Sequence, residues 1–316
     1  MQDKNGLGLG TAQNGGAGRR VMVKNTTAAD MATIRDTFGY KVDPIDGSTL
    51  IFPSIDAAVG VVRSNLGDEI MVSEGYTETI STATAINLDV AGVKLVGRGH
   101  GDSRPTITLD TATTTTIPVT AANIWIENIV LTANFADIVS FFTLTTANNF
   151  RLENCEFKAT ATNMNCKYVV DTNTTTDGAK GLTINKCRWI EPDLSTESMV
   201  KMDGDNSLVS ITNNFVSLGV KNNTPALMAI ITAKSVFNAD ISYNRVFRLN
   251  TDSATGALLV TTDQADNSGF INNNFVQHAD TAAELLVTAS SGFGVFDNKM
   301  SGVAGASGYL LPAADS

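Results

Sequence analysis

The feature that most constrains the fold of this 316-residue chain is a repeat of about 30 residues. Each copy begins with an aliphatic residue, and another apolar residue follows five positions later. The first residues of the copies are Ile126, Leu152, Ile184, Ile211, Ile241, Ile271 and Val295. A second series of strand-like runs lies between them and includes Val170, Val200, Ile230 and Val260, each 30 residues from the next. Because these windows lack the 3.6-residue period of helices, two strand series with one shared period predict a solenoid of stacked strands.

Asparagines recur at the third position after the aliphatic residue, where the chain is expected to bend inward between two strands. They are Asn214, Asn244, Asn274 and Asn298. Stacked about 4.8 Å apart, such amides can bond to one another and to the backbone of the bend, so that buried polar groups are satisfied. We therefore predict a structural ladder of these four residues, with Asn272 and Asn273 on the outside of the turn.

The two preceding copies carry Cys155 and Cys187 at the ladder position. Small thiols fit there without hydrogen-bond partners. Stacking would place their Cβ atoms about 4.8 Å apart, whereas a disulfide needs about 3.8 Å, so both are predicted to be free.

The chain resembles the right-handed parallel β-helices of the pectate-lyase-like superfamily, which carry asparagine ladders at such a bend. The resemblance is strongest in the first coil, with an amphipathic helix at SIDAAVGVV (54–62), strands in GDEIMVSEGYTETI (67–80) and a strand at VKLVGRG (93–99). It covers about residues 50–311. It implies an all-β, right-handed parallel β-helix of about eight to nine coils with a small amino-terminal α/β cap.

Three regions are expected along the chain. Residues 1–20 form a Gly-rich arm that lies on the body or on a partner, residues 21–52 form an α/β lead-in and cap, and residues 53–316 form the β-helix. A helix is predicted at TTAADMATIRDTF (26–38), and Ser54 is a candidate cap of the helix that follows. The lead-in resembles the start of phage β-helix proteins found near head genes. That resemblance implies a non-enzymatic virion structural protein, such as a capsid decoration or head-associated protein.

The composition of the chain excludes some classes of binding partner. A net charge of −10, with no run of Lys or Arg, argues against nucleic acid as a partner. No apolar run approaches the roughly 18 residues of a membrane helix, and the start MQDKNGLGLG lacks the apolar region of a signal peptide. We expect synthesis in the host cytoplasm, no metal or other cofactor, and contact with the major capsid protein or another virion protein through the amino-terminal region. A homo-oligomer, with a trimer favoured, suits this setting.

The alternative is a tailspike-like depolymerase or an adhesin acting on bacterial surface polysaccharide. A lyase needs carboxylates that bind Ca²⁺ together with a basic residue, and Lys201 near Asp203 and Asp205 is the candidate cluster; the same aspartates also suit a turn. His100, in GHG, is interpreted as a turn residue, because the paired aspartates of the polygalacturonase motif are missing. No catalytic residue is assigned.

Phe215 and Phe275 follow the ladder position directly and are expected to point outward. They are candidate interface residues for a protein contact, unless a long loop folds over them. Glu153 and Glu156, with Lys186 and Arg188 one coil later, are expected to form charge pairs between coils.

Overall fold

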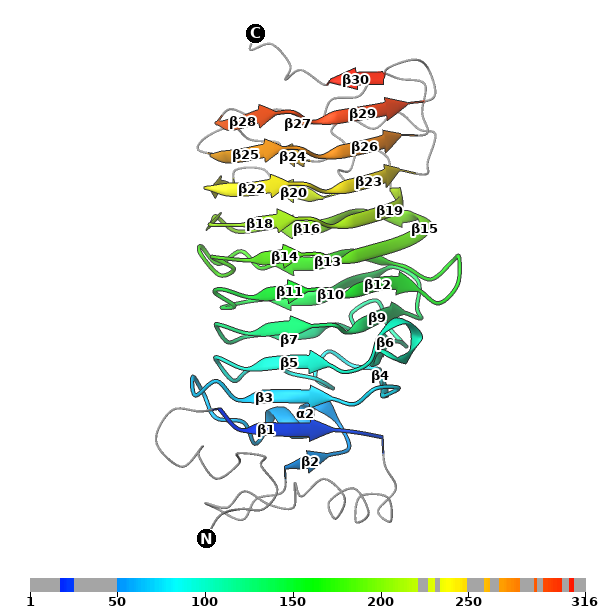
Figure 1. The fold of residues 1–316 in the computed structure, drawn as a ribbon, viewed down its shortest axis with the longest axis vertical. Coiled ribbons are helices and arrows are strands. Elements are labelled where there is room, and N and C mark those ends of the chain that lie inside the picture. The colour runs from blue at the N-terminus through cyan, green and yellow to red at the C-terminus, as the bar shows by residue number, and fades with distance from the viewer. Residues whose placement is uncertain are drawn as a thin grey trace, which may run out of the picture.

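The computed structural model describes residues 18–25, 50–220, 227–230, 234–248, 259–261, 267–278, 287–288, 292–302 and 307–309. Over these residues the chain is a parallel β-solenoid, with the first strands at one end of the stack and the last at the other (Figure 1). The helix predicted at residues 26–38 and residues 1–17 of the arm lie outside the described residues.

Sheet A has eleven strands and begins with the lead-in. Its strands, in chain order, are β1 (Arg20–Val23), β2 (Ile51–Phe52), β3 (Glu69–Val72), β5 (Lys94–Gly97), β8 (Trp125–Glu127), β11 (Arg151–Glu153), β14 (Thr183–Asn185), β18 (Ser210–Thr212), β22 (Ala239–Ser242), β25 (Gly269–Asn272) and β28 (Phe293–Phe296). Strand β1 pairs in parallel with both β2 and β3, so the lead-in extends the sheet beyond the first coil.

Sheet B has ten strands and follows sheet A around the bend. Its strands are β4 (Thr77–Ile80), β6 (Thr106–Leu109), β9 (Val130–Ala133), β12 (Glu156–Ala159), β15 (Arg188–Thr196), β19 (Phe215–Val220), β23 (Arg245–Arg248), β26 (Phe275–His278), β29 (Lys299–Gly302) and β30 (Ser307–Tyr309). The last pair, β29 with β30, is antiparallel.

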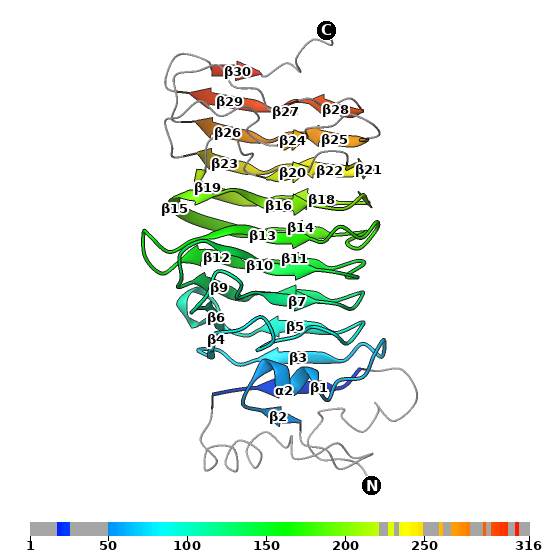
Figure 2. The ribbon, with the colours of Figure 1, turned by 180° about the vertical axis from the view of Figure 1, so that it is seen from behind.

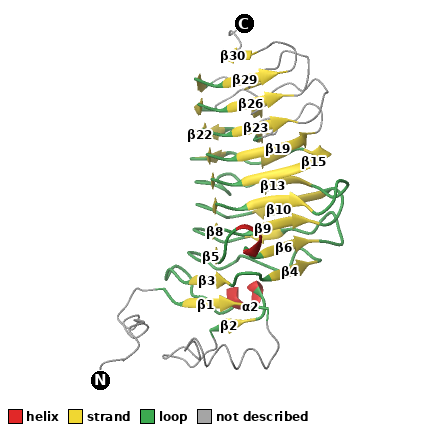
Figure 3. Cartoon of the chain, turned by 45° about the vertical axis from the view of Figure 1, so that its right-hand side comes forward, coloured by secondary structure: helices red, strands yellow, loops and turns green. Residues whose placement is uncertain are grey.

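Sheet C has seven strands. They are β7 (Ile117–Val119), β10 (Ile138–Leu144), β13 (Cys166–Thr172), β16 (Ser198–Met202), β20 (Met228–Ile230), β24 (Leu259–Thr261) and β27 (Val287–Thr288). A further short pair joins β17 (Asn206–Ser207) to β21 (Val236–Phe237) between sheets C and A. The three sheets recur in the order A, B, C along the chain, as the turned views show (Figures 2 and 3).

The number of coils is about seven, and the prediction of eight to nine was too high. Sheet C supplies one strand to each complete coil and has seven strands among the described residues. In the first coil its place is taken by an isolated bridge between Leu88 and Val119. Sheets A and B begin before sheet C, so the number of their strands is larger than the number of complete coils.

The core lies between the sheets because alternate residues of each strand point inward. In β3 and β5 the alternate residues Ile70, Val72 and Leu95 are buried. Near the start of the solenoid, helix α2 (Ile55–Val59) packs on β1, β2 and β3. Ser54 caps this helix by accepting the N–H of Ala57 at 3.3 Å, as predicted.

A buried carboxylate ties the end of the amino-terminal arm to the first coil. Asp68 is fully buried and accepts the backbone N–H of Arg19 at 2.7 Å and that of Arg63 at 2.8 Å. The guanidinium of Arg63 adds an ion pair at 2.8 Å. Burial alone would raise the pKa of Asp68, but the hydrogen bonds from Arg63 and Arg19 hold that pKa below its usual value.

The bend from sheet A to sheet B contains the asparagine ladder. Asn214, Asn244 and Asn274 each donate Nδ2 to Oδ1 of the next ladder asparagine, at 3.0, 2.9 and 2.9 Å, and the series ends at Asn298. Each of the four also donates Nδ2 to a backbone carbonyl of the preceding coil, at 2.8 to 2.9 Å. The amino-terminal end of the ladder is closed by Cys187, whose N–H donates to Asn214 Oδ1 at 2.8 Å.

Two columns of left-handed residues flank sheet A, where a column means the same position in successive coils. The column before the sheet contains Asn123, Asn149, Gly181, Leu208 and Asn238, with φ from 54° to 76°. The column after it contains Asn128, Asn154, Lys186, Asn213, Tyr243, Asn273 and Asp297, with φ from 50° to 60°. Most members are Asn, Asp or Gly, the residues that adopt this conformation at least cost.

Candidate functional site

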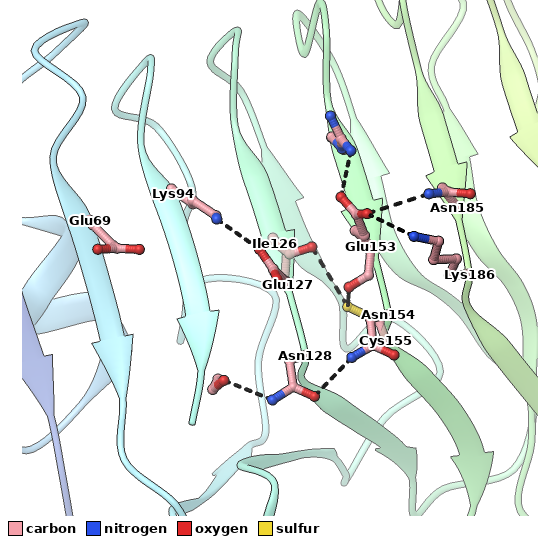
Figure 4. Close-up of polar contacts among 12 residues, drawn as sticks. Glu69, Lys94, Ile126, Glu127, Asn128, Glu153, Asn154, Cys155, Asn185 and Lys186 are labelled. Carbon is pink, nitrogen blue, oxygen red and sulfur yellow. Dashed lines mark hydrogen bonds and ion pairs between the residues drawn. The ribbon is translucent and has the colours of Figure 1, made fainter. Parts of the chain in front are cut away.

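The outer face of sheet A is charged in its first coils (Figure 4). Lys94 pairs with Glu127 at 2.7 Å, and Glu153 receives Arg151 at 2.5 Å and Lys186 at 4.0 Å. The Lys94–Glu127 and Lys186–Glu153 contacts join neighbouring coils, whereas Arg151 and Glu153 lie on the same strand, β11. Of the pairs predicted between coils, Glu153–Lys186 forms, but Glu156 pairs with Arg104 and Lys158 and not with Arg188. Because the partners are half exposed, each pair is worth at most about 1 kcal/mol, and the set is a structural feature of the surface.

Trp125 lies on the same face between two cations. Lys94 Nζ is 3.7 Å and the Arg151 guanidinium carbon 4.3 Å from the Trp125 ring centroid. Both ring faces are therefore occupied, so Trp125 is not a free platform for a sugar. Trp189, the apolar residue five positions after Ile184, is fully buried in the core.

An outer pair of asparagines runs beside these charges. Asn154 donates Nδ2 to Asn128 Oδ1 at 3.2 Å, and Asn128 donates Nδ2 to the carbonyls of Gly97 and Gly99 at 2.8 and 2.9 Å (Figure 4). The adjoining turn, Gly101–Ser103, is closed by Ser103, whose side chain bonds the backbone of His100 at 2.8 and 3.0 Å. His100 is thus a turn residue.

A cluster of polar side chains lies on sheet C around Lys201, the basic residue of the candidate cluster predicted from the sequence. Lys201 Nζ lies 2.6 Å from Asp203 and 3.6 Å from Asp171, the residue opposite it on β13. Its ammonium also lies 5.5 Å from the Tyr168 ring centroid, and the Tyr168 hydroxyl hydrogen-bonds to Glu197. The carboxylates outnumber the ammonium, so the cluster has an excess of negative charge.

Protonation in this cluster is shifted by burial. Burial raises the pKa of Asp171 to about 6, although Lys201 opposes the shift. The pKa of Lys201 is raised, because its hydrogen bond to Asp203 and the nearby Asp171 outweigh burial. The Tyr168 pKa is raised by burial and by Glu197. A buried carboxyl group with a raised pKa beside a second carboxyl group is an arrangement that sugar hydrolysis can use.

Asp205 does not join Lys201, contrary to the cluster predicted from the sequence. Its Oδ1 accepts the backbone N–H of Ser235 at 2.8 Å in the next coil, which makes it a turn residue. Asp171, 30 residues before Lys201, takes its place. Within the described residues, no group of three or more His, Cys, Asp or Glu is arranged to hold a metal ion.

The predicted interface residues Phe215 and Phe275 are half buried. Phe247 joins them, with ring centroids 5.3 Å from Phe215 and 6.2 Å from Phe275. The three rings belong to the successive strands β19, β23 and β26 of sheet B. They form a continuous aromatic surface instead of two separate contact points.

A second apolar surface was not predicted. We call it the apolar strip, and it lies along sheet A and the turns beside it in the last coils. Its members are Leu208, Phe237, Tyr243, Phe270 and Phe296, which are 53%, 38%, 58%, 57% and 52% exposed. The rings of Phe270 and Phe296 are 6.2 Å apart. Aromatic side chains of this size, exposed together over consecutive coils, are typical of a binding surface.

Two members of the strip occupy left-handed positions. Leu208 has φ 60° and Tyr243 has φ 58°, in columns where most coils carry Asn, Asp or Gly. A left-handed conformation costs a residue with a bulky side chain about 1–2 kcal/mol. Both side chains are more than half exposed, so burial within the chain offsets only part of this cost.

Similarity to known proteins is limited to fold. No protein-family model matches the chain, and no curated protein matches it. An alginate lyase from Paenibacillus sp. str. FPU-7 aligns with 13% identity and a TM-score of 0.45 over 77% of this chain and 94% of the lyase. ORF18 of Geobacillus virus E2 aligns with 12% identity and a TM-score of 0.41 over 96% of this chain and 65% of that protein. At this level of similarity, neither protein's activity is carried over to this chain.

Proposed function

We propose that the chain is a non-enzymatic structural protein of a phage particle that docks on another virion protein, such as the major capsid protein. The observation that carries this proposal is the apolar strip. Burying about 100 Å² of each exposed side chain would contribute about 2–3 kcal/mol, so the four rings and Leu208 together offer enough apolar area for a stable contact.

The virion setting is supported by the lead-in, whose sequence resembles that of phage β-helix proteins. The amino-terminal arm remains the second proposed contact with the shell, and residues 1–17 lie outside the described residues. A solenoid suits this role because every coil contacts only its neighbours, which leaves the sides of the stack free for partners. The described residues include no helix long and apolar enough to span a bilayer.

The test is sedimentation of the purified chain with heads that lack it. The wild-type chain is expected to co-sediment with the heads, and a Phe270→Ser/Phe296→Ser variant is expected to lose most of this binding. The matched control is Leu66→Ser/Val139→Ser, because these residues are 44% and 40% exposed outside the strip. Equal binding of the three chains, or no binding by any, would overturn the proposal.

A second candidate, a polysaccharide-cleaving enzyme, is favoured by one observation. Asp171, with its pKa raised to about 6, lies beside Lys201 and Asp203 on the outer face of sheet C. The activity would appear as new reducing ends when bacterial surface polysaccharide is incubated with the chain. Loss of that activity in Asp171→Asn, with wild-type folding, would establish the enzyme and replace the structural role.

A further inference from the structure

The outer face of sheet B alternates cations and phenyl rings along the solenoid axis. The residues opposite one another in successive strands are Arg188, Phe215, Arg245, Phe275 and Lys299. We call this set the Arg–Phe column. Figure 3 shows the strands that carry it, β15, β19, β23, β26 and β29, stacked one above another. Sheet A has a shorter run of this kind, Lys94, Trp125 and Arg151, but there both cations form ion pairs with Glu127 and Glu153.

Two cations of the column, Arg188 and Arg245, are accessible to a ligand. Arg188 and Arg245 are exposed, and neither forms an ion pair within the described part of the chain. Arg188 instead makes a cation–π contact, with its guanidinium carbon 5.5 Å from the centroid of the Phe215 ring. Such a contact holds the guanidinium in place beside the ring while its N–H donors stay free.

Beyond β15, which contains Glu191 and Asp193, the charge of this face is opposite to that of the whole molecule. The chain has 32 Asp and Glu residues and a net charge of −10, but none of these residues occurs in β19, β23, β26 or β29. Those four strands contain Arg245, Arg248 and Lys299 instead. A local cationic stripe on an acidic protein favours a ligand with spaced negative charges.

The spacing of the cations along the Arg–Phe column indicates which class of anionic ligand fits it. Cations recur every second coil, about 9.6 Å apart at about 4.8 Å for each strand step, and a phenyl ring lies between each pair. Single-stranded nucleic acid carries a phosphate on every nucleotide and needs a denser row of cations, which the acidic chain would also repel. An acidic polysaccharide with one carboxylate in each disaccharide presents the matching alternation of charge and apolar sugar face.

We propose that the Arg–Phe column binds an acidic polysaccharide whose repeating unit carries one carboxylate for every two sugars. The guanidinium groups of Arg188 and Arg245 receive successive carboxylates, and Phe215 and Phe275, with Phe247 beside them, pack against the sugar rings between. This binding involves no cleavage, and it goes beyond docking on a virion protein because it uses a different face of the solenoid.

The experiment uses the full chain and a hyaluronan decasaccharide, which alternates glucuronate and N-acetylglucosamine, in isothermal titration calorimetry. Binding that weakens as salt rises is expected, as is at least about tenfold weaker binding by Arg245→Gln, because a charge-assisted hydrogen bond is lost. Arg151→Gln, which removes a cation from sheet A, is the matched control and should bind as wild type does. The thermal midpoint of each variant checks its folding.

Probes of other chemistry separate the alternatives. A neutral chitin-derived oligosaccharide, a dT10 oligonucleotide and a decamer of glutamate are titrated under the same conditions. Tighter binding of any of these than of hyaluronan would overturn the proposal. So would absence of hyaluronan binding at about 1 mM, which corresponds to less than about 4 kcal/mol of binding free energy, or an equal effect of Arg245→Gln and Arg151→Gln.

Discussion

Asn244 donates its side-chain amide to Oδ1 of Asn274 at 2.9 Å, and the same oxygen accepts the backbone N–H of Asn244 at 3.0 Å. The ladder thus satisfies both the side chain and the backbone of the bend. Each inner asparagine is at once an acceptor for the preceding coil and a donor to the following one. This double role explains why one residue type recurs at this position.

Replacing an inner member should cost more than replacing the last. Asn244→Ala leaves the backbone N–H and Nδ2 of Asn214 without their acceptor, and it removes donors from Ile211 O and Asn274 Oδ1. Each unsatisfied buried group costs about 1–3 kcal/mol, so a loss of at least about 2 kcal/mol is expected. Asn298→Ala should lose less, since Asn298 has a ladder neighbour on one side. Urea unfolding of both variants measures the difference.

The control for the ladder is an outward asparagine. Asn273 is exposed and has φ 51°, so Asn273→Gly keeps the left-handed turn and should stay within about 0.5 kcal/mol of wild type. A glycine variant is needed here because alanine would add strain at this φ. If Asn273→Gly were as damaging as Asn244→Ala, the inward assignment of the ladder would be wrong.

Relief of strain in the apolar strip should stabilise the free chain. Leu208→Asn and Tyr243→Asn place a residue that tolerates the left-handed conformation at φ 60° and φ 58°. Each is expected to raise the free energy of unfolding by about 0.5–1 kcal/mol while weakening binding to heads. Thermal denaturation and co-sedimentation of the same samples test the two effects. Variants that are less stable than wild type would show that these side chains are held for folding.

The free energy of unfolding should depend on pH through the ionisation of Asp171. The pKa of Asp171 is about 6 in the folded state and about 4 in the unfolded state. Between pH 4 and pH 6 the carboxyl group is therefore protonated in the folded chain and ionised in the unfolded chain. Stability from this group is therefore present below pH 4 and is lost as pH rises through 6. Asp171→Asn should remove that dependence and be more stable than wild type by about 1–3 kcal/mol at pH 7, with little difference at pH 4. Urea unfolding at the two pH values gives the comparison.

The cysteines should be chemically silent in the folded chain. Cys155, Cys166 and Cys187 are free and buried, and burial raises the pKa of Cys166 and Cys187 well above the usual range. Burial also acts to raise the pKa of Cys155, but hydrogen bonds, the largest from Cys187, lower it, so Cys155 is protected by its lack of exposure. A thiol reagent at pH 8 is therefore expected to modify none of them until denaturant is added, after which three thiols react. A disulfide between Cys155 and Cys187 would instead leave one reactive thiol.

The sequence predicted the solenoid and the ladder because both follow from a period that is visible in the chain. The anchor Ile211 is followed by Asn214 as Ile241 is by Asn244, and strand stacking turns this spacing into contact. The coil count was less accurate, since the first coil has only the Leu88–Val119 bridge in place of a sheet C strand.

The candidate sites were harder to predict because they depend on register between coils. Lys201 was grouped with Asp205, its close neighbour in sequence, but Asp205 bonds Ser235 and the true partner Asp171 lies one coil earlier. The strained positions of Leu208 and Tyr243 likewise become visible only when each is aligned with the asparagines above and below it. The signal is a bulky residue in an asparagine column, and it can be read once the coils are in register.

The most direct test of the proposed role is hydroxyl-radical footprinting of the chain free in solution and bound to purified heads. We expect strong protection of Tyr243, Phe270 and Phe296 in the bound state, because these exposed rings would be covered by the partner. Leu66, exposed but outside the strip, should be labelled equally in both states. Equal labelling of the three rings in free and bound chains would contradict docking through the apolar strip.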